Sequence, residues 1–219
     1  MLPTCTHLAI MLNADRVILQ DKERWSRKSR VHRAKIRKPQ GTQWINIPIR
    51  TKDRKKAINK VRIDHEEEWI TPLLRSLEYN YRNSIYYDFY EPEIKTDLES
   101  ATDYEYLLPF ILYIQKRLLT FMELDLEWEL SSEMEDYTSD PDELAKRLGA
   151  DILYTRNMRA ATTSARRNPK PKLEFSHPTY HQHFDGFEPW CCILDLLFQF
   201  GPESFRITDQ LKGSSIKEG

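Results

Sequence analysis

The densest set of groups that could do chemistry lies in the segment 177–188. It contains three of the six histidines of the chain and two carboxylates: His177, His181, His183, Asp185 and Glu188. Histidine exchanges a proton near pH 7, and a nearby carboxylate can orient its ring or raise its pKa. The segment therefore predicts a general acid–base centre. On a strand, His181, His183 and Asp185 would instead share one face at a spacing that suits a metal. A solvated surface turn is the third interpretation, because proline and glycine interrupt the segment.

A second set surrounds Asp21, which ends a short apolar run, 15–21. A carboxylate at the end of a strand is well placed for a ligand crevice in an α/β sheet. The cations that follow it are Arg24, Arg27, Lys28, Arg30, Arg33, Lys35, Arg37 and Lys38. Arginine holds phosphate with two parallel hydrogen bonds, so these residues are candidates for an anion site. For most of them a solvated face is the alternative, and we expect two or three to touch a ligand.

The charges of the chain are sorted by segment, although the formal net charge of its 219 residues is −1. Residues 16–62, the basic block, hold 17 Lys and Arg against 3 acids. Residues 64–143, the acidic block, hold 5 Lys and Arg against 22 acids. The basic block predicts an anionic partner such as a phosphate, a nucleotide or a nucleic-acid backbone. Alternatively, the two blocks face each other in the fold and partly neutralise.

Several classes of function are disfavoured by missing motifs. With six glycines, the chain has neither a phosphate-binding Gly loop nor a dinucleotide fingerprint, and it lacks Cys-x-x-Cys. We therefore expect no cofactor and no metal. No stretch approaches 18 apolar residues, which predicts that no helix crosses a membrane. Three cysteines cannot form a disulfide framework, and together with the absence of a signal peptide they predict a cytoplasmic protein.

Strands and helices alternate in the predicted secondary structure. Strands are expected at 15–21, 44–49, 61–63, 126–130 and 151–154, and helices at 69–81, 103–122, 140–149 and 189–200. Residues 22–38 are expected to form a partly helical excursion, and 156–172 a loop. This order predicts an α/β fold, with a single mixed sheet flanked by helices in a Rossmann-like layering. We expect one domain over 1–211 and a flexible tail over 212–219.

Motifs along nearly the whole chain resemble the WbqC-like protein family, which is encoded in bacterial O-antigen, surface-polysaccharide and specialised-metabolite gene clusters. The residues that carry the resemblance are Leu19-Gln-Asp21, Trp25-Ser-Arg-Lys-Ser29, Pro39-Gln-Gly-Thr-Gln-Trp44, Leu148-Gly-Ala-Asp151, His177-Pro178, Gly186-Phe187-Glu-Pro189 and Ile193-Leu-Asp-Leu-Leu-Phe198. The opening residues 1–4 and the turn 155–159 depart from the family pattern. This departure predicts a different substrate or a loss of activity.

The resemblance implies a transferase that moves an acyl or amino-acyl group, of the glycine type, onto an amino-sugar or a related acceptor during biosynthesis. It implies His177 as general base and Asp21 as the group that orients the acceptor. Arg27, Lys28 and Arg33 would hold the phosphate of an activated donor, and Trp44 and Glu188 would contact substrate. His181 and His183 do not stand on positions of the family pattern, which speaks against a metal site.

Two other functions remain open at this point. The basic block could bind nucleic acid, for example an aminoacyl-tRNA donor. The chain could also be a non-catalytic scaffold of a biosynthetic complex. The expected partners of the transferase are a phosphate-bearing small-molecule donor and a small-molecule or carrier-bound acceptor, without a membrane.

Overall fold

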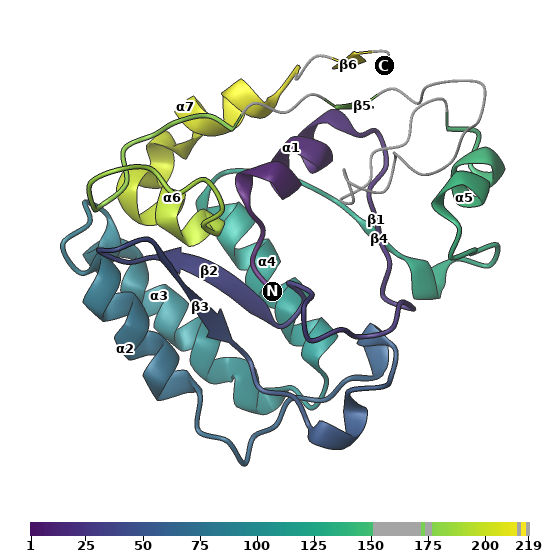
Figure 1. Cartoon of the computed structure of the whole chain (residues 1–219), viewed down its shortest axis with the longest axis horizontal. Coiled ribbons are helices and arrows are strands. Elements are labelled where there is room, and N and C mark those ends of the chain that lie inside the picture. Colours follow the sequence, from purple (N-terminus) through teal and green to yellow (C-terminus); the bar gives the residue numbers. More distant parts are fainter. Residues whose placement is uncertain (151–171, 174–176, 214–215, 218–219) are drawn as a thin grey trace.

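The computed structural model describes residues 1–150, 172–173, 177–213 and 216–217 (Figure 1). The α-helices in this part of the chain are α1 (Cys5–Asn13), α2 (Ile70–Tyr81), α3 (Tyr87–Glu99), α4 (Leu107–Phe121), α5 (Pro141–Arg147), α6 (Ile193–Phe200) and α7 (Phe205–Thr208). The strands are β1 (Ile18–Leu19), β2 (Arg33–Arg37), β3 (Thr42–Asn46), β4 (Glu129–Leu130), β5 (Lys172–Leu173) and β6 (Ile216–Lys217). The predicted strand 151–154 and nearly all of the predicted loop 156–172 lie outside the described residues.

The α/β class is confirmed, but the single mixed sheet is wrong for the described residues. Their strands form three separate pairs: β1 with β4 in parallel, β2 with β3 antiparallel, and β5 with β6 antiparallel. A Rossmann-like layer needs central strands that are apolar on both faces. The longest strands here, β2 and β3, alternate polar and apolar residues, so they can bury only one face. The hairpin therefore packs as a unit of its own against helices.

Apolar helices build most of the interior. All residues of α6 except the last are buried, and this helix contacts α3, α4 and β2. One continuous cluster of buried side chains extends from Met1 to Leu211. The prediction of one domain over 1–211 stays a prediction. So does the flexible tail, of which residues 216–217 pair with β5.

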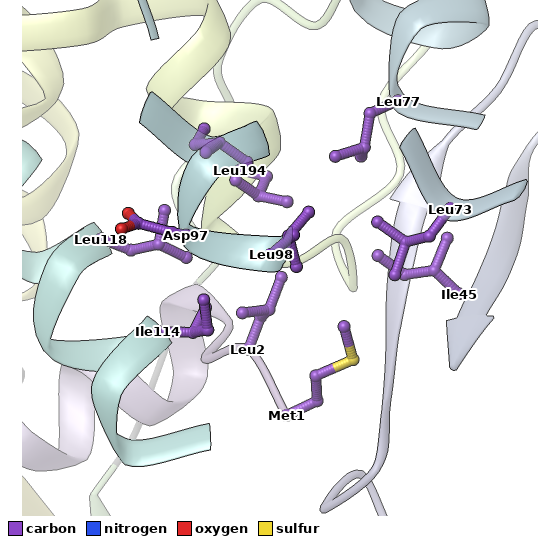
Figure 2. A pocket seen from close by; sticks show the side chains of 11 residues that line it. Met1, Leu2, Ile45, Leu73, Leu77, Asp97, Leu98, Ile114, Leu118 and Leu194 are labelled. Atoms are coloured by element: carbon purple, nitrogen blue, oxygen red, sulfur yellow. The ribbon is translucent and has the colours of Figure 1, made fainter. Parts of the chain in front are cut away.

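A small apolar cavity lies between the N-terminal residues Met1 and Leu2 and helices α2, α3, α4 and α6 (Figure 2). Its volume is about 20 Å³, and Met1, Leu2, Leu98 and Leu194 are among the side chains that line it. Such a space holds about one water molecule at most. It is a packing defect of the core and not a ligand pocket.

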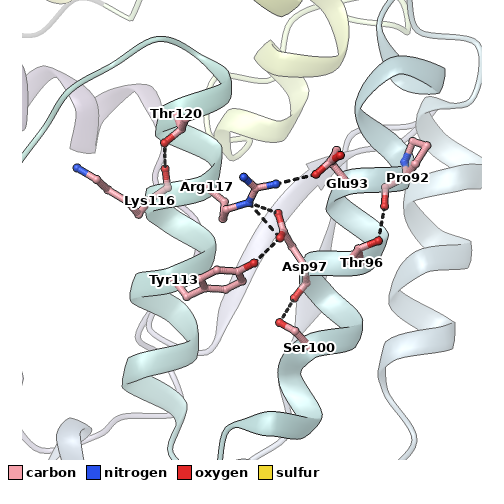
Figure 3. Close-up of polar contacts among 9 residues, drawn as sticks. All are labelled: Pro92, Glu93, Thr96, Asp97, Ser100, Tyr113, Lys116, Arg117 and Thr120. Carbon is pink, nitrogen blue, oxygen red and sulfur yellow. Dashed lines mark hydrogen bonds and ion pairs between the residues drawn. The ribbon is translucent and has the colours of Figure 1, made fainter.

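A cluster of hydrogen bonds and ion pairs joins α3 to α4 (Figure 3). The carboxylate of Asp97 accepts hydrogen bonds from the Tyr113 hydroxyl at 2.5 Å and from Arg117 Nε at 2.9 and 3.0 Å. The Arg117 Nη2 atom also donates to Glu93 at 2.7 Å. A charged residue of the acidic block is thus neutralised by an arginine of the same block.

All three cysteines of the chain are buried and free. Cys5 begins α1, and Cys192 immediately precedes α6. A backbone bridge between Thr4 and Cys192 joins these two segments. Cys5 and Cys192 therefore lie where the start of α1 meets the start of α6.

Candidate functional site

The hairpin β2–β3 has an apolar inner face and a cationic outer face. Ala34, Ile36 and Ile45 are 0–4% exposed on the inner face. Strand residues alternate in direction, so Arg33 and Lys35 point to the opposite, outer face. Lys35 stands directly across the hairpin from Trp44. The sequence Arg-Ala-Lys-Ile-Arg of β2 thus produces a strand with cations on one side and core residues on the other.

The indole ring of Trp44 is surrounded by three cations on this outer face. The centre of the Arg33 guanidinium lies 4.1 Å from the ring centroid, that of Arg30 lies at 5.2 Å, and Lys35 Nζ lies at 5.4 Å. The Trp44 side chain is nevertheless 38% exposed. We call Arg30, Arg33, Lys35 and Trp44 the Trp44 face. Positive charge beside an open aromatic ring suits a ligand with a planar group and a phosphate.

The Arg33 guanidinium is held in place by the backbone before it. Its Nη2 atom donates to the carbonyl of Lys28 at 2.7 Å, and its Nε atom donates to the carbonyl of Ser29 at 3.1 Å. The side chains of Arg27 and Lys28 are exposed beside this turn. Of the predicted phosphate-binding residues, Arg33 therefore belongs to an ordered site, and the other two border it.

His177 joins the Trp44 face through Trp190. The Cys192 N–H donates to the Lys35 carbonyl at 2.8 Å, which places the segment before α6 along β2. Arg30 Nη1 donates to the Trp190 carbonyl at 3.4 Å. The Trp190 ring, 51% exposed, lies 6.3 Å from the His177 ring, centroid to centroid. Trp190 thus links the predicted residue His177 to the Trp44 face, which contains the predicted residues Arg33 and Trp44.

The His177 imidazole is half-buried in an aromatic setting. Its ring lies 5.3 Å from that of Phe187, and its Nδ1 atom is 3.0 Å from the carbonyl of Pro178. A carbonyl only accepts, so this contact assigns the proton to Nδ1. Burial lowers the pKa of His177, against the opposing effect of hydrogen bonds to backbone carbonyls. The ring is therefore neutral at pH 7, which is the form that can accept a proton.

Asp21 lies in a different set of contacts. It is 2% exposed, and its carboxylate accepts hydrogen bonds from Ser131 Oγ at 2.7 Å, the Ser132 N–H at 2.8 Å and Asn59 Nδ2 at 3.1 Å. Burial works to raise the pKa of this carboxyl group, but the hydrogen bonds from Ser132, Ser131 and Asn59 hold it below the ordinary value. None of these partners is shared with the named contacts of His177. The catalytic role of Asp21 stays a prediction.

Glu188 is fixed through its backbone. Its N–H donates to Gln182 Oε1 at 2.7 Å, and its carbonyl accepts from Gln182 Nε2 at 3.1 Å. Its carboxylate lies beside the hairpin turn, since a Cβ atom on Gly41 would be 3.6 Å from Glu188 Oε1. The predicted substrate contact therefore stands at the turn end of the hairpin.

A network of buried polar groups connects the loop that carries His177 to the helices beneath it. Asp195, which is fully buried in α6, accepts from Gln182 Nε2 at 2.8 Å and from the Tyr81 hydroxyl at 3.2 Å. That hydroxyl in turn accepts the Arg37 N–H at 2.8 Å. Burial raises the pKa of Asp195 to about 6, although hydrogen bonds oppose the shift. The network links α2, α6, β2 and the loop that carries His177.

Arg37 connects the hairpin to that same loop. Its guanidinium donates to the carbonyls of Lys38 and Gly41 at 2.6 and 2.8 Å, and also to that of Asp185. Because this arginine is 2% exposed, it cannot serve as a surface phosphate ligand. It fixes the position of the 184–186 turn relative to the Trp44 face.

The sequence indicated Arg30 and Arg37 only as members of the run of candidate anion-binding cations, and it did not assign Trp190 or Asp195 to the site. The alternation in residues 33–37 could have revealed β2 and hence the common face of Arg33 and Lys35. Trp190 was expected inside the last apolar helix, but α6 begins at Ile193. No local pattern indicates that Trp190 lies beside His177, because that contact depends on the fold of the loop.

Within the described residues, no group of three or more His, Cys, Asp or Glu side chains is placed to hold a metal ion. No helix in this part of the chain is both long enough and apolar enough to span a membrane. The predicted cytoplasmic location has no test in these findings.

Comparison with known proteins gives one match. No curated protein and no solved structure is significantly similar to the chain. Among models of protein families, the one described as the WbqC-like protein family matches residues 1–207. Because this match covers nearly the whole length, the chain belongs to the WbqC-like protein family.

Proposed function

We propose that the protein is a transferase that moves an acyl or amino-acyl group from a phosphate-bearing donor to the amine of an amino-sugar or a related acceptor. The observation that carries this proposal is that Trp190 links His177 to the Trp44 face, through its ring beside His177 and its carbonyl bonded to Arg30. A basic nitrogen and an ordered anion site on one surface are what such a transfer requires.

The Trp44 face would hold the donor. A planar group of the donor stacks on the exposed indole, and Arg33 with Arg30 binds its phosphate. Two backbone carbonyls already orient the Arg33 guanidinium, so little side-chain entropy is lost when it binds. The exposed side chains of Arg27 and Lys28 extend the positive surface for additional phosphate oxygens.

His177 would take the proton of the attacking amine. The amine nitrogen forms a bond to the acyl carbon, and the bond from that carbon to the phosphate oxygen breaks. The amine proton passes to Nε2 of His177 and then to solvent, while the phosphate leaves as an anion held by Arg33. Nε2 is buried in the structure, so the proposal requires the side chains around it to shift when the substrates bind.

The carboxylates of Glu188 and Asp21 have different roles in the proposed reaction. Glu188 stands near the hairpin turn, where it can accept hydrogen bonds from an acceptor sugar. Both Asp21 oxygens already accept hydrogen bonds from the protein, which favours a positioning role for this residue over direct contact with the acceptor.

The test uses glycyl adenylate as donor and glucosamine as acceptor, with mass spectrometry to detect the N-glycyl product. His177→Gln should lower the rate by about 10²-fold or more, since general-base catalysis contributes that much. The rate of the wild type relative to that of His177→Gln should fall only at a pH below the ordinary histidine pKa, because burial lowers the pKa of His177. Product formation at the wild-type rate by His177→Gln contradicts the proposal.

Donor binding is measured separately by tryptophan fluorescence with UDP and with inorganic pyrophosphate. Arg33→Gln should weaken binding about tenfold, which corresponds to one lost charged hydrogen-bond contact. Arg75→Gln is the matched control, because Arg75 is an exposed arginine on α2, outside the Trp44 face. Equal losses in both variants would show that the binding depends only on net charge.

A further inference from the structure

An exposed positive surface lies next to the Trp44 face, and apart from Arg27 and Lys28 its residues have no part in the proposed transfer. It is formed by two segments, 22–28 and 50–60, which we call the cationic loops. Their exposed Lys and Arg side chains are Lys22, Arg24, Arg27, Lys28, Lys52, Arg54, Lys55, Lys56 and Lys60. Such a surface needs an explanation, because like charges held close together repel.

Backbone hydrogen bonds join the two segments side by side (Figure 1). The Trp25 N–H donates to the Lys56 carbonyl at 2.9 Å, and the Ile58 N–H donates to the Glu23 carbonyl at 2.9 Å. The Asn59 N–H donates to the Asp21 carbonyl at 3.0 Å. The side chain of Asn59 also donates a hydrogen bond to the buried Asp21 carboxylate. The exposed cations are therefore carried by two segments whose backbones are fixed to each other by hydrogen bonds.

The acids of the region leave most of these cations unneutralised. Asp53 is fully buried, and its carboxylate binds Arg62 Nε at 2.8 Å and Lys56 Nζ at 2.6 Å. The remaining eight cations of the loops form no ion pair with a carboxylate among the described residues. Eight such charges on two segments exceed what a single phosphate can use.

The loops continue into the Trp44 face. The carbonyls of Lys28 and Ser29, at the end of the first loop, hold the Arg33 guanidinium that stacks on Trp44. A row of cations that leads to an exposed aromatic ring is the arrangement by which proteins bind single-stranded nucleic acid. An acidic protein surface would use the cations but not the ring, and a duplex offers the ring no unstacked base.

We propose that the cationic loops bind the phosphate backbone of a single-stranded polynucleotide, one base of which stacks on Trp44. The inference adds a partner to the proposed transferase and does not require the transfer reaction. The shared chemistry is that of RNA and DNA strands, and the experiment includes both.

The experiment measures the fluorescence anisotropy of a labelled 12-nucleotide RNA and of the DNA of the same sequence, at 50 to 200 mM NaCl. Four or more phosphate contacts predict that log K falls with log salt at a slope of about −3 or steeper. Lys52→Gln/Arg54→Gln/Lys55→Gln should weaken binding at least tenfold and make the slope shallower by about 2. Binding of one strand type alone identifies the source and supports the proposal.

A matched triple variant controls for net charge. Arg75→Gln/Arg82→Gln/Lys95→Gln removes the same number of exposed cations from α2, the residue after it and α3, and should change the affinity less than threefold. Trp44→Ala should weaken binding fivefold or more with the salt slope unchanged, as expected for loss of one stacked base. The loop triple should bind UDP and pyrophosphate as the wild type does, which separates this inference from the proposed function.

Three results would overturn the inference. They are a flat salt response, an equal loss of affinity in the control triple, and competition by poly-glutamate as strong as that by poly-uridylate. The last result would assign the loops to an acidic protein. Melting temperatures of all variants show whether a lost affinity reflects a lost fold.

Discussion

At the scale of single residues, two buried aspartates show how burial and hydrogen bonds compete. The Asp21 carboxylate accepts from Ser131, Ser132 and Asn59, and these donors outweigh burial, so its pKa is lowered. Asp195 lies deeper, and burial prevails, so its pKa is raised to about 6. Asp21 therefore stabilises the fold as an anion, whereas an ionised Asp195 costs stability that its hydrogen bonds only partly offset.

Asp195→Asn should change the pH dependence of stability. The folded pKa of Asp195, about 6, lies above the value in the unfolded chain, so its contribution is full below about pH 4 and is lost as pH rises through 6. That loss is up to roughly 3 kcal/mol. His32 acts oppositely, because burial lowers its pKa to about 4 and its contribution is lost as pH falls below 6.5.

Urea unfolding at pH 4.5, 5.5, 6.5 and 7.5 checks this prediction. The free energy of unfolding of Asp195→Asn, relative to the wild type, should rise with pH, because only the wild type loses stability when Asp195 ionises, and His32 is common to both proteins. A difference between the two proteins that stays constant across the four pH values would contradict the raised pKa.

At the scale of elements, the helices predicted from the sequence are present in the structure, but the predicted single sheet is not. Spacings of three and four apolar residues predicted 69–81 and 103–122, and the structure has α2 (Ile70–Tyr81) and α4 (Leu107–Phe121) there. The structure adds α1 and α3, which were not predicted. Residues 33–37 were expected in a partly helical excursion, yet they form β2, because pairing with β3 overrides weak local preferences.

The candidate site was predictable as residue types but not as a grouping. His177, Arg33 and Trp44 were selected from the sequence; the structure places Arg33 against Trp44 and links His177 to them through Trp190 and Arg30. Asp21 was selected with them but lies in other contacts, because a carboxylate at a strand end marks a ligand crevice only in a continuous sheet. In this protein β1 has two residues and pairs only with β4, so there is no such crevice at its end among the described strands.

The hairpin turn gives a prediction at this scale. Gly41 has φ +88°, which strains any other residue, so Gly41→Ala should lower the free energy of unfolding by about 1–3 kcal/mol. Because the turn sets the pairing of β2 and β3, the variant should also bind UDP more weakly. Gly149→Ala is the matched control: Gly149 has φ +64° and open space around it, beyond the end of α5.

Urea unfolding and fluorescence titration of both glycine variants provide the measurement. The control should lose a similar amount of stability while its affinity for UDP stays within about twofold of the wild type. If both variants lose affinity equally, the hairpin is not what positions Arg33 and Trp44.

At the scale of the whole molecule, the two charge blocks neutralise each other little by contact. Among the described residues, two ion pairs join the basic block to the acidic block: Arg16 with Glu129 at 2.5 Å, and Arg62 with Glu105 at 3.7 Å. Apart from Glu143, which pairs with Arg147 just beyond the acidic block, the other described ion pairs of these blocks are internal, as with Asp53 and Asp97. The alternative in which the two blocks face each other and their charges cancel is therefore disfavoured. The like charges within each block still repel one another.

Salt should consequently stabilise the protein. Repulsion between exposed charges is screened within about 10 Å at 0.1 M salt. An increase from 20 to 200 mM NaCl should raise the melting temperature by about 2–4 °C, which corresponds to about 1 kcal/mol for a chain of this size. Differential scanning calorimetry of the wild type and of Lys52→Gln/Arg54→Gln/Lys55→Gln is the test. The triple variant should melt higher at low salt and respond less, whereas a melting temperature that falls with salt would mean that attraction between the blocks dominates.

The burial of the three cysteines has a practical consequence for such experiments. Burial raises the pKa of the Cys5 and Cys192 thiols to about 12, and that of Cys191 as well, so at neutral pH none forms the thiolate that reacts with maleimide. A cysteine introduced on a cationic loop, for example Lys55→Cys, would then be the one reactive thiol of the folded chain. A fluorophore or spin label attached there would report ligand arrival directly, with the native sequence otherwise unchanged.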